Sequence, residues 1–173
     1  MSISVVRLLW LAAAGAFALM ADQPLPAAFD QRINSPNKRY YALIIAREKR
    51  TAVYDASTKT RMWEMEGWFR VAALADDGEH FITGYDGVNL IPANYDPKMS
   101  MLTFYRNGKA FRSVTLQELV PDLARLQPTA SHVYWGYYAG FENGLFRVDT
   151  VDRGALLFDP ATGELVQHKQ AGR

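Results

Sequence analysis

Three stretches of the sequence decide the fold: VYDASTKTRMWEM (residues 53–65), FYRNGKAFRSVTL (104–116) and LFDPATGELVQH (157–168). Each contains an aromatic residue, then a short polar turn, then a second apolar segment, which is the pattern of two strands joined by a tight turn. The aromatic residues Tyr54, Tyr105 and Phe158 are 51 and 53 residues apart. A period of about 50 residues predicts that a unit of several strands is repeated three times.

A further strand with its own aromatic residue precedes each of these stretches. These upstream residues, Tyr41, Phe81 and Phe146, lie 13, 24 and 12 residues before the aromatic residue of the following stretch. The middle separation is longer by about the length of the segment 87–99, which contains two prolines and has no clear hydrophobic period. We therefore expect three antiparallel β-meanders, the second interrupted by a long loop at 87–99.

The phrases SPNKRYYALI (35–44), ADDGEHFITGYDG (75–87) and LLFDPATGELV (156–166) resemble the turn–strand segments of WD-repeat and YVTN-type β-propeller blades. The resemblance spans most of residues 33–168, although the Gly-His and Trp-Asp pairs of WD repeats are absent. It implies a mainly β fold of about three propeller blades, whereas a complete ring has about four to eight. It also implies a protein that binds partners, but it transfers no functional residue. The alternative fold is a β-sandwich.

One short helical insertion interrupts the strands after residue 114. Thr115 and Glu118 have the spacing of a capping box, in which each side chain binds the backbone N–H of the other residue. Pro121 has no N–H and is expected to break or kink the helix. The apolar residues that fall on one helical face are Leu116, Leu119, Val120, Leu123 and Leu126.

The amino-terminal residues have the pattern of a secretory signal. Arg7 precedes an uncharged apolar run that ends in small residues before Asp22, and this run is too short to cross a bilayer comfortably. We expect a signal peptide at 1–21, an extended leader at 22–32, a single β-repeat domain at 33–168 and a tail at 169–173. The expected location is the bacterial periplasm or the cell exterior, with no stable membrane span after cleavage.

Charge and cysteine content exclude several classes of protein. The sequence has 19 basic and 18 acidic residues, and loss of residues 1–21 removes only Arg7, which leaves a net charge of zero. A neutral chain lacks the cationic surplus that nucleic-acid binding requires, so no nucleic-acid partner is expected. The absence of cysteine excludes disulfides and thiol nucleophiles. No motif indicates a cofactor.

The stretch HVYWGYYAGF (132–141) has the highest local density of aromatic residues. Taken as one strand, it places Trp135 on a core face and Tyr134, Gly136 and Tyr138 together on the opposite face. Two tyrosines on either side of a glycine leave a groove in which an aromatic ring, a sugar or a peptide could stack. Packing by cross-strand neighbours is the competing interpretation, and it is the one that we favour. Tyr134 and Tyr138 are nevertheless candidate ligand-binding residues.

The long loop at 87–99 is the second candidate site, because long loops on rigid scaffolds often carry function. Its candidate ligand-binding residues are Asn94, Tyr95 and Asp96. No metal site is expected, since the three histidines have no metal-ligand spacing.

Taken together, these patterns favour a non-catalytic binding module for a protein partner or a small ligand of the cell envelope. The alternative is an envelope hydrolase whose site assembles from His80, Asp86, His132 and the loop at 87–99. A homodimer formed through exposed sheet edges is a further possibility.

Overall fold

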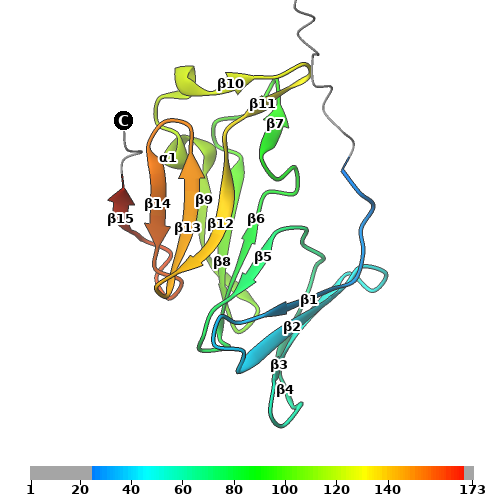
Figure 1. Ribbon diagram of the computed structural model, residues 1–173. Coiled ribbons are helices and arrows are strands. Elements are labelled where there is room, and N and C mark those ends of the chain that lie inside the picture. Colours follow the sequence, from blue (N-terminus) through cyan, green and yellow to red (C-terminus); the bar gives the residue numbers. More distant parts are fainter. Residues whose placement is uncertain (1–24, 170–173) are drawn as a thin grey trace, which may run out of the picture.

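The computed structural model describes residues 25–169. The predicted signal peptide at 1–21, residues 22–24 of the leader and residues 170–173 of the tail lie outside the described residues. Within the described part, the expected mainly β class is confirmed: the strands form four antiparallel sheets, rather than the two sheets of a sandwich (Figure 1).

Three of the sheets are four-stranded meanders whose strands lie side by side in chain order. The first meander comprises β1 (Gln31–Asn34), β2 (Tyr40–Ile45), β3 (Arg50–Asp55) and β4 (Arg61–Glu66). The second meander comprises β5 (Ala72–Leu74), β6 (His80–Gly84), β8 (Ser100–Arg106) and β9 (Lys109–Thr115). The third meander comprises β12 (Gly136–Glu142), β13 (Leu145–Thr150), β14 (Gly154–Phe158) and β15 (Leu165–Lys169).

The register of the strands confirms the partner strands predicted from the spacing of aromatic residues. In each meander, the aromatic residue of the second strand lies directly opposite that of the third strand. Opposite residues on one face of a sheet are close enough to pack together, which explains why aromatic residues recur at these positions. The three pairs are Tyr41 with Tyr54, Phe81 with Tyr105, and Phe146 with Phe158.

The turns of the meanders repeat as well. Between the first and second strands, the N–H of Ser35 donates to the carbonyl of Tyr40 over 3.0 Å, and the N–H of Ala75 donates to the carbonyl of His80 over 2.9 Å. Both turns therefore have the same length and the same closing hydrogen bond. In β4, Trp63 is buried whereas Glu64 and Glu66 are exposed, which is the alternation of a strand with one buried face.

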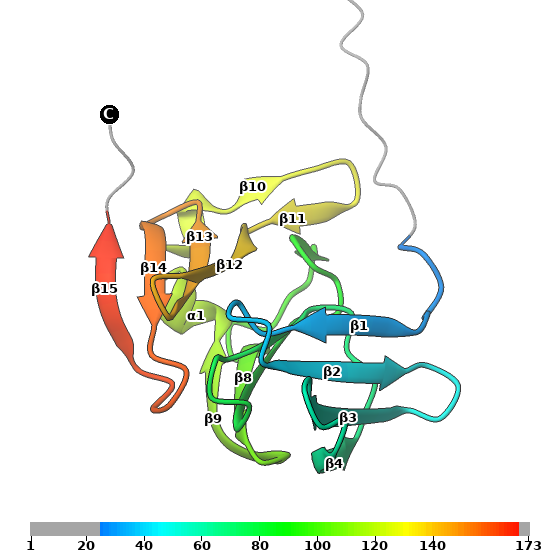
Figure 2. The ribbon, with the colours of Figure 1, turned by 60° about the horizontal axis from the view of Figure 1, so that its bottom comes forward.

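Consecutive meanders pack face to face (Figure 2). One core cluster joins the first and second meanders, and it contains Val53 of β3 and Phe81 of β6. A larger cluster joins the second and third meanders, and it contains Ile82 of β6 and Val148 of β13. Because Phe81 and Ile82 are adjacent, β6 presents one side chain to each cluster, and the second meander buries both of its faces.

The fourth sheet is short and is built from two segments that are distant in sequence. It has the order β10 (Gln127–Pro128), β11 (His132–Tyr134), β7 (Leu90–Pro92), and we call it the added sheet. The interpretation of 87–99 as a loop without regular structure is therefore wrong, because β7 lies inside it. Its three residues are too few for a periodic signal to be visible in the sequence.

The helical insertion has the predicted start. Helix α1 (Leu116–Leu119) begins at Thr115, and its capping box with Glu118 is present. It ends at Val120, immediately before Pro121, and the 3-10 helix η1 (Leu123–Arg125) follows.

The aromatic stretch 132–141 is not one strand, so its predicted faces are wrong from residue 136 onward. β11 ends at Tyr134 and β12 begins at Gly136, with Trp135 between them. Gly136 has a φ of +150°, and a Cβ atom at this residue would lie 2.1 Å from the carbonyl oxygen of Asp149. Only glycine allows this close approach of two backbones.

Candidate functional site

The two candidate sites of the sequence analysis lie side by side in the structure. β11, from the aromatic stretch, pairs with β7, from the inserted loop, so that Val133 lies opposite Ile91 and Tyr134 lies opposite Leu90. The added sheet sits at the end of the stack of meanders that lies at the top of Figure 1. We therefore treat the added sheet and its connections as one candidate site.

Trp135 anchors the added sheet to the meanders. Its side chain is fully buried, and its indole Nε1–H donates to the carbonyl of Val88 over 2.9 Å. Its backbone N–H donates to the backbone carbonyl of Asn89 over 3.3 Å, and its backbone carbonyl accepts from the N–H of Val151 over 3.1 Å. Trp135 thus binds the inserted loop on one side and the third meander on the other. The sequence analysis assigned it to the core but did not foresee these contacts.

Tyr138 points into the molecule, where its hydroxyl bonds to backbone groups. The hydroxyl donates to the carbonyl of Met101 over 2.7 Å and accepts from the N–H of Tyr85 over 2.8 Å. Its ring packs edge-on against Trp135, with 5.1 Å between the ring centroids. Burial raises the pKa of the Tyr138 phenol, so it stays protonated. This geometry gives Tyr138 a structural role, because its hydroxyl joins β12 of the third meander to the end of β6 and to β8 of the second meander.

The break before Gly136 brings Tyr137, not Tyr138, to the surface. Tyr137 is 47% exposed, and a hydrogen bond to Asp149 raises its pKa. Tyr134 is partly buried in β11. The predicted pair of Tyr134 and Tyr138 does not form one exposed face, because Tyr138 points into the molecule whereas Tyr137 is exposed. An isolated glycine within a strand pattern is a signal of such a break.

The candidate residues of the inserted loop differ in their surroundings. Asn94 is exposed. Tyr95 is partly buried and packs against the larger core cluster. Asp96 shapes the return to β8, because its carboxylate accepts from the N–H of Lys98 over 2.8 Å and its carbonyl accepts from the N–H of Met99 over 2.9 Å. Asn94 and Asp96 are therefore exposed, whereas Tyr95 is not.

The structure does not bring the hydrolase residues together around one point. His80 begins β6 and Asp86 follows its other end, and the strand alone spans about 13 Å at about 3.3 Å per residue. The His80 ring bonds to Asp77 over 2.6 Å, while Asp86 forms an ion pair with Arg70 over 3.2 Å. His132 does lie beside the inserted loop, opposite Pro92.

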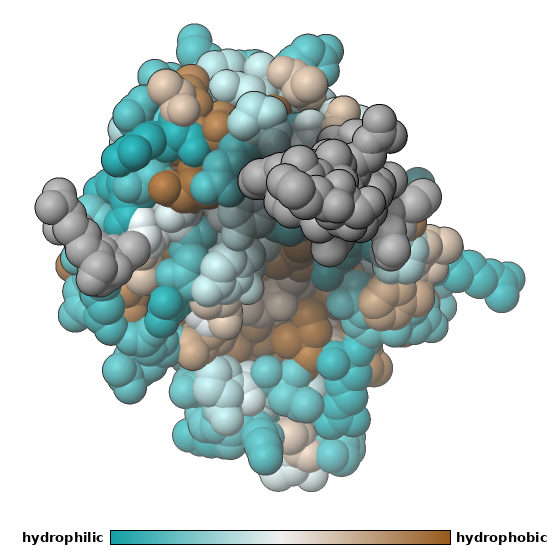
Figure 3. All heavy atoms as spheres, turned by 45° about the horizontal axis from the view of Figure 1, so that its top comes forward, coloured by the Kyte–Doolittle hydropathy of each residue, from teal (hydrophilic) through white to brown (hydrophobic). Residues whose placement is uncertain are grey.

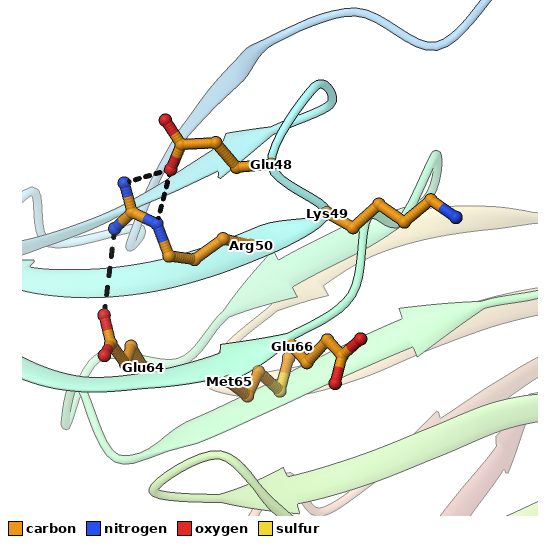
Figure 4. A pocket seen from close by; sticks show the side chains of 6 residues that line it. All are labelled: Glu48, Lys49, Arg50, Glu64, Met65 and Glu66. Carbon is orange, nitrogen blue, oxygen red and sulfur yellow. Dashed lines mark hydrogen bonds and ion pairs between the residues drawn. The ribbon is translucent and has the colours of Figure 1, made fainter.

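A charged depression of about 320 Å³ lies at the hairpin between β2 and β3 (Figure 4). In it, Arg50 contacts Glu48 over 2.7 Å and Glu64 over 3.8 Å. Lys49 and Glu66 point away from this chain of charges. Such ion pairs between exposed side chains are typical of a solvated surface. The depression therefore has no group directed at a ligand.

A second recess, of about 220 Å³, lies at the end of the stack that is opposite the added sheet. Turns of the three meanders meet there. Its carboxylates hold the turns in place: Asp76 accepts from the N–H of Asn37 over 2.7 Å, and Asp77 accepts from the N–H of Glu79 over 2.9 Å and of His80 over 3.0 Å. Among residues 25–169, no group of three or more His, Cys, Asp or Glu side chains could hold a metal ion.

The end that carries the added sheet has a different surface. Figure 3, in which the top of Figure 1 comes forward, shows a hollow near the middle of this face with hydrophobic side chains inside it and hydrophilic side chains around it. A search of the described residues for a helix of sufficient length and apolarity to cross a membrane finds none.

Comparisons with known proteins identify no family. No protein-family model and no curated protein matches this sequence. Among solved structures, the chain is similar to hydrazine synthase of Kuenenia stuttgartiensis, with 13% identity and a TM-score of 0.38 over 81% of this chain and 36% of that one. It is also similar to the dihydro-heme d1 dehydrogenase NirN in complex with DHE, with 14% identity and a TM-score of 0.39 over 84% of this chain and 29% of that one. The chain thus spans about a third of the length of these structures, and similarity at this level carries no functional argument.

Proposed function

We propose that this protein is an exported, non-catalytic binding module, in which three propeller-type blades present a binding surface on the added sheet. The three blades are the three meanders, which repeat in strand order and in aromatic pairing, and the first two also share the turn that closes on Tyr40 or His80. Face-to-face packing of successive four-stranded meanders is how propeller blades stack.

One observation carries the binding proposal: β7 and β11 pair to form a sheet that the repeats do not require. The segments come from positions 90–92 and 132–134, and they meet at the end of the stack that also carries a hollow lined with hydrophobic side chains. Concave, partly apolar surfaces with polar groups around them are where ligands and partners bind. The proposed contact residues are Asn94 and Tyr134, joined by Tyr137.

The ligand is a protein partner or a small molecule of the cell envelope. A ring or a sugar would stack on the tyrosines, whose hydroxyls would orient it. In support, His80 is bonded to Asp77 and Asp86 is paired with Arg70, so these two residues of the alternative hydrolase site are engaged in separate structural contacts.

A thermal-shift screen of the chain 22–173 against sugars, peptidoglycan fragments and envelope peptides tests the proposal. A ligand at about 100 times its dissociation constant adds about 2.7 kcal/mol to the free energy of unfolding. Asn94→Ala and Tyr134→Ala should abolish the shift while leaving the Tm of the free protein almost unchanged. If neither variant alters binding of a ligand that the screen finds, the added sheet is not the binding surface.

Self-association through sheet edges is a second candidate function, and the outermost strands of the meanders support it. Exposed apolar side chains lie on these strands: Met62 on β4, Phe111 on β9, and Leu165 and Val166 on β15. An edge strand of this kind can pair with another chain. Light scattering should then detect dimers that Val166→Lys dissociates. A wild-type protein that stays monomeric at about 1 mM would contradict the candidate. The binding free energy of any dimer would then be weaker than about 4 kcal/mol.

A further inference from the structure

Residues 25–30, the part of the leader that the structure describes before β1, lie along the connection between β4 and β5. It is the blue segment before β1 in Figure 1, and it has no regular secondary structure. Two side chains of the connection hold it: the indole Nε1–H of Trp68 donates to the carbonyl of Phe29 over 2.8 Å, and the guanidinium of Arg70 donates to the carbonyl of Pro26 over 2.8 Å.

These contacts are of the kind that recognise an extended peptide. Both hydrogen bonds go to backbone carbonyls, three residues apart, so they depend on an extended main chain and not on particular side chains. The ring of Phe29 packs edge-on against Trp68, with 6.5 Å between the centroids. Aromatic grooves that take proline-containing peptides use the same combination, since such peptides are already extended before binding.

The groove is held in shape by contacts that do not involve the leader. The Arg70 guanidinium lies over the Trp68 ring, 5.0 Å from its centroid, and forms an ion pair with Asp86 over 3.2 Å. Only 13% of the Arg70 side chain is exposed. A cation that is stacked on a ring and paired with a carboxylate keeps its position. Binding of a peptide therefore costs little side-chain conformational entropy in the groove.

The leader itself is held loosely. Leu25 is 46% exposed and Phe29 is 51% exposed, and neither belongs to a core cluster. Beyond Phe29, Asp30 accepts from the N–H of Ala46 over 2.8 Å, which fixes the chain where β1 begins. Residues 25–29 can therefore leave the groove without disturbing the first meander, because few buried contacts oppose local opening.

We propose that Trp68, Arg70 and Asp86 form a peptide-binding groove, occupied in the free protein by the chain's own leader. Its ligand is an extended segment of a partner protein with proline followed three residues later by an aromatic residue. The leader competes with this segment from the same molecule, and its tethering gives it a millimolar effective concentration. The groove is separate from the added sheet, so each can fail without the other.

The test uses the chain 22–173 labelled with 5-fluorotryptophan, whose three tryptophans, Trp63, Trp68 and Trp135, give separate fluorine resonances. Phe29→Ala weakens the hold of the leader at an exposed position and should leave the fold intact. The probe is the acetylated, amidated peptide QPLPAAF, which copies residues 23–29. We expect a saturable shift of the Trp68 resonance alone, and binding to wild-type protein about tenfold weaker because the leader competes.

Two further variants, made in the Phe29→Ala protein, separate the groove from non-specific binding. Trp68→Phe keeps a ring but loses the N–H donor, and Arg70→Gln loses the cation; we expect each to weaken binding about tenfold. Binding to the Trp68→Phe protein is followed by the intensity loss in one-dimensional spectra of the peptide. Arg39→Gln is the matched control, because Arg39 also lies over a ring, that of Tyr40, but belongs to the turn at the end of β1 remote from residues 25–30.

Three outcomes would overturn the proposal. One is no saturation at several millimolar peptide, and another is equal binding of a peptide with the same composition in scrambled order. The third is equal binding to the Trp68→Phe and Arg39→Gln proteins. The comparison with the scrambled peptide can be made on the wild-type protein, so a folding defect in a variant does not protect the proposal.

Discussion

The meanders and the added sheet differ in how they are held together. Each meander is built from neighbouring strands joined by short turns, and its register recurs in all three copies. The added sheet has strands of two or three residues from distant segments, and it depends on a few anchors, among them Ile91 and Trp135. A regular scaffold can therefore support an irregular surface, provided that this surface sends buried side chains into the core of the scaffold.

The largest effect is expected where the two regions join. In Gly136→Ala, the new methyl group would meet the Asp149 carbonyl at 2.1 Å, so β12 could not pair with β13. We expect a loss of more than about 4 kcal/mol of stability, or no folding. Gly140→Ala is the matched control in the same strand: its φ is +92°, with nothing within 4 Å, so about 1–2 kcal/mol of backbone strain is expected. Equal losses measured by urea unfolding would refute the steric argument.

A second prediction asks whether the added sheet is part of the core. Ile91 of β7 and Ile82 of β6 are both buried in the same cluster, with 0% and 1% exposure. We expect Ile91→Ala and Ile82→Ala to cost about 2–5 kcal/mol each, from the lost contacts and the cavity. The midpoint of chemical unfolding measures both. A loss below 1 kcal/mol for Ile91→Ala alone would mean that the added sheet is a peripheral attachment.

A third prediction separates the buried tyrosine from its exposed neighbour. Tyr138→Phe removes two hydrogen bonds, but the N–H of Tyr85 also donates to the carbonyl of Met101 over 3.1 Å and keeps that partner, so we expect a cost of about 1 kcal/mol. Tyr137→Phe should leave the Tm almost unchanged, because Tyr137 is at the surface. If Tyr138→Phe were as stable as wild type, the two hydrogen bonds of the hydroxyl would not contribute to the stability of the fold.

The smallest effect concerns a turn in the first meander. Hydrogen bonds from the Ser57 hydroxyl and the N–H groups of Thr58 and Ser57 lower the pKa of Asp55 to about 2, from 3.8. Since the pKa is lowered in the folded state, this stabilisation is complete above about pH 3.8 and is lost as the pH falls through about 2. Ser57→Ala should raise the pKa toward its ordinary value, as followed by carboxyl NMR titration. An unchanged midpoint would exclude the hydroxyl as the main cause.

The sequence predicts the meanders better than the added sheet because their signals are local. Alternation around Trp63 and the spacing of Thr115 and Glu118 each lie within a few residues, and both correspond to the structure. Even Phe81 and Tyr105, separated by the insertion, could be matched because the other two copies define the pattern.

The sequence predicts which segments contain the candidate site, but not the contacts of the residues within it. The hydroxyl of Tyr138 bonds to backbone groups 37 and 53 residues away, and backbone groups leave no trace in the residue pattern. The break at Gly136 depends on the approach of the Asp149 carbonyl from another strand, so alternation alone continued across it. For the same reason, the contacts of Trp68 and Arg70 with the leader carried no signal.

The burial of both faces of the second meander has a consequence for how the molecule opens. The first and third meanders share no core cluster, so each is stabilised by the second. Either outer meander can open while the other stays packed, but opening the second exposes both clusters at once. The amide protons of β6 and β8 should therefore exchange with solvent only when the whole chain unfolds, whereas those of β2 and β14 can exchange through smaller openings.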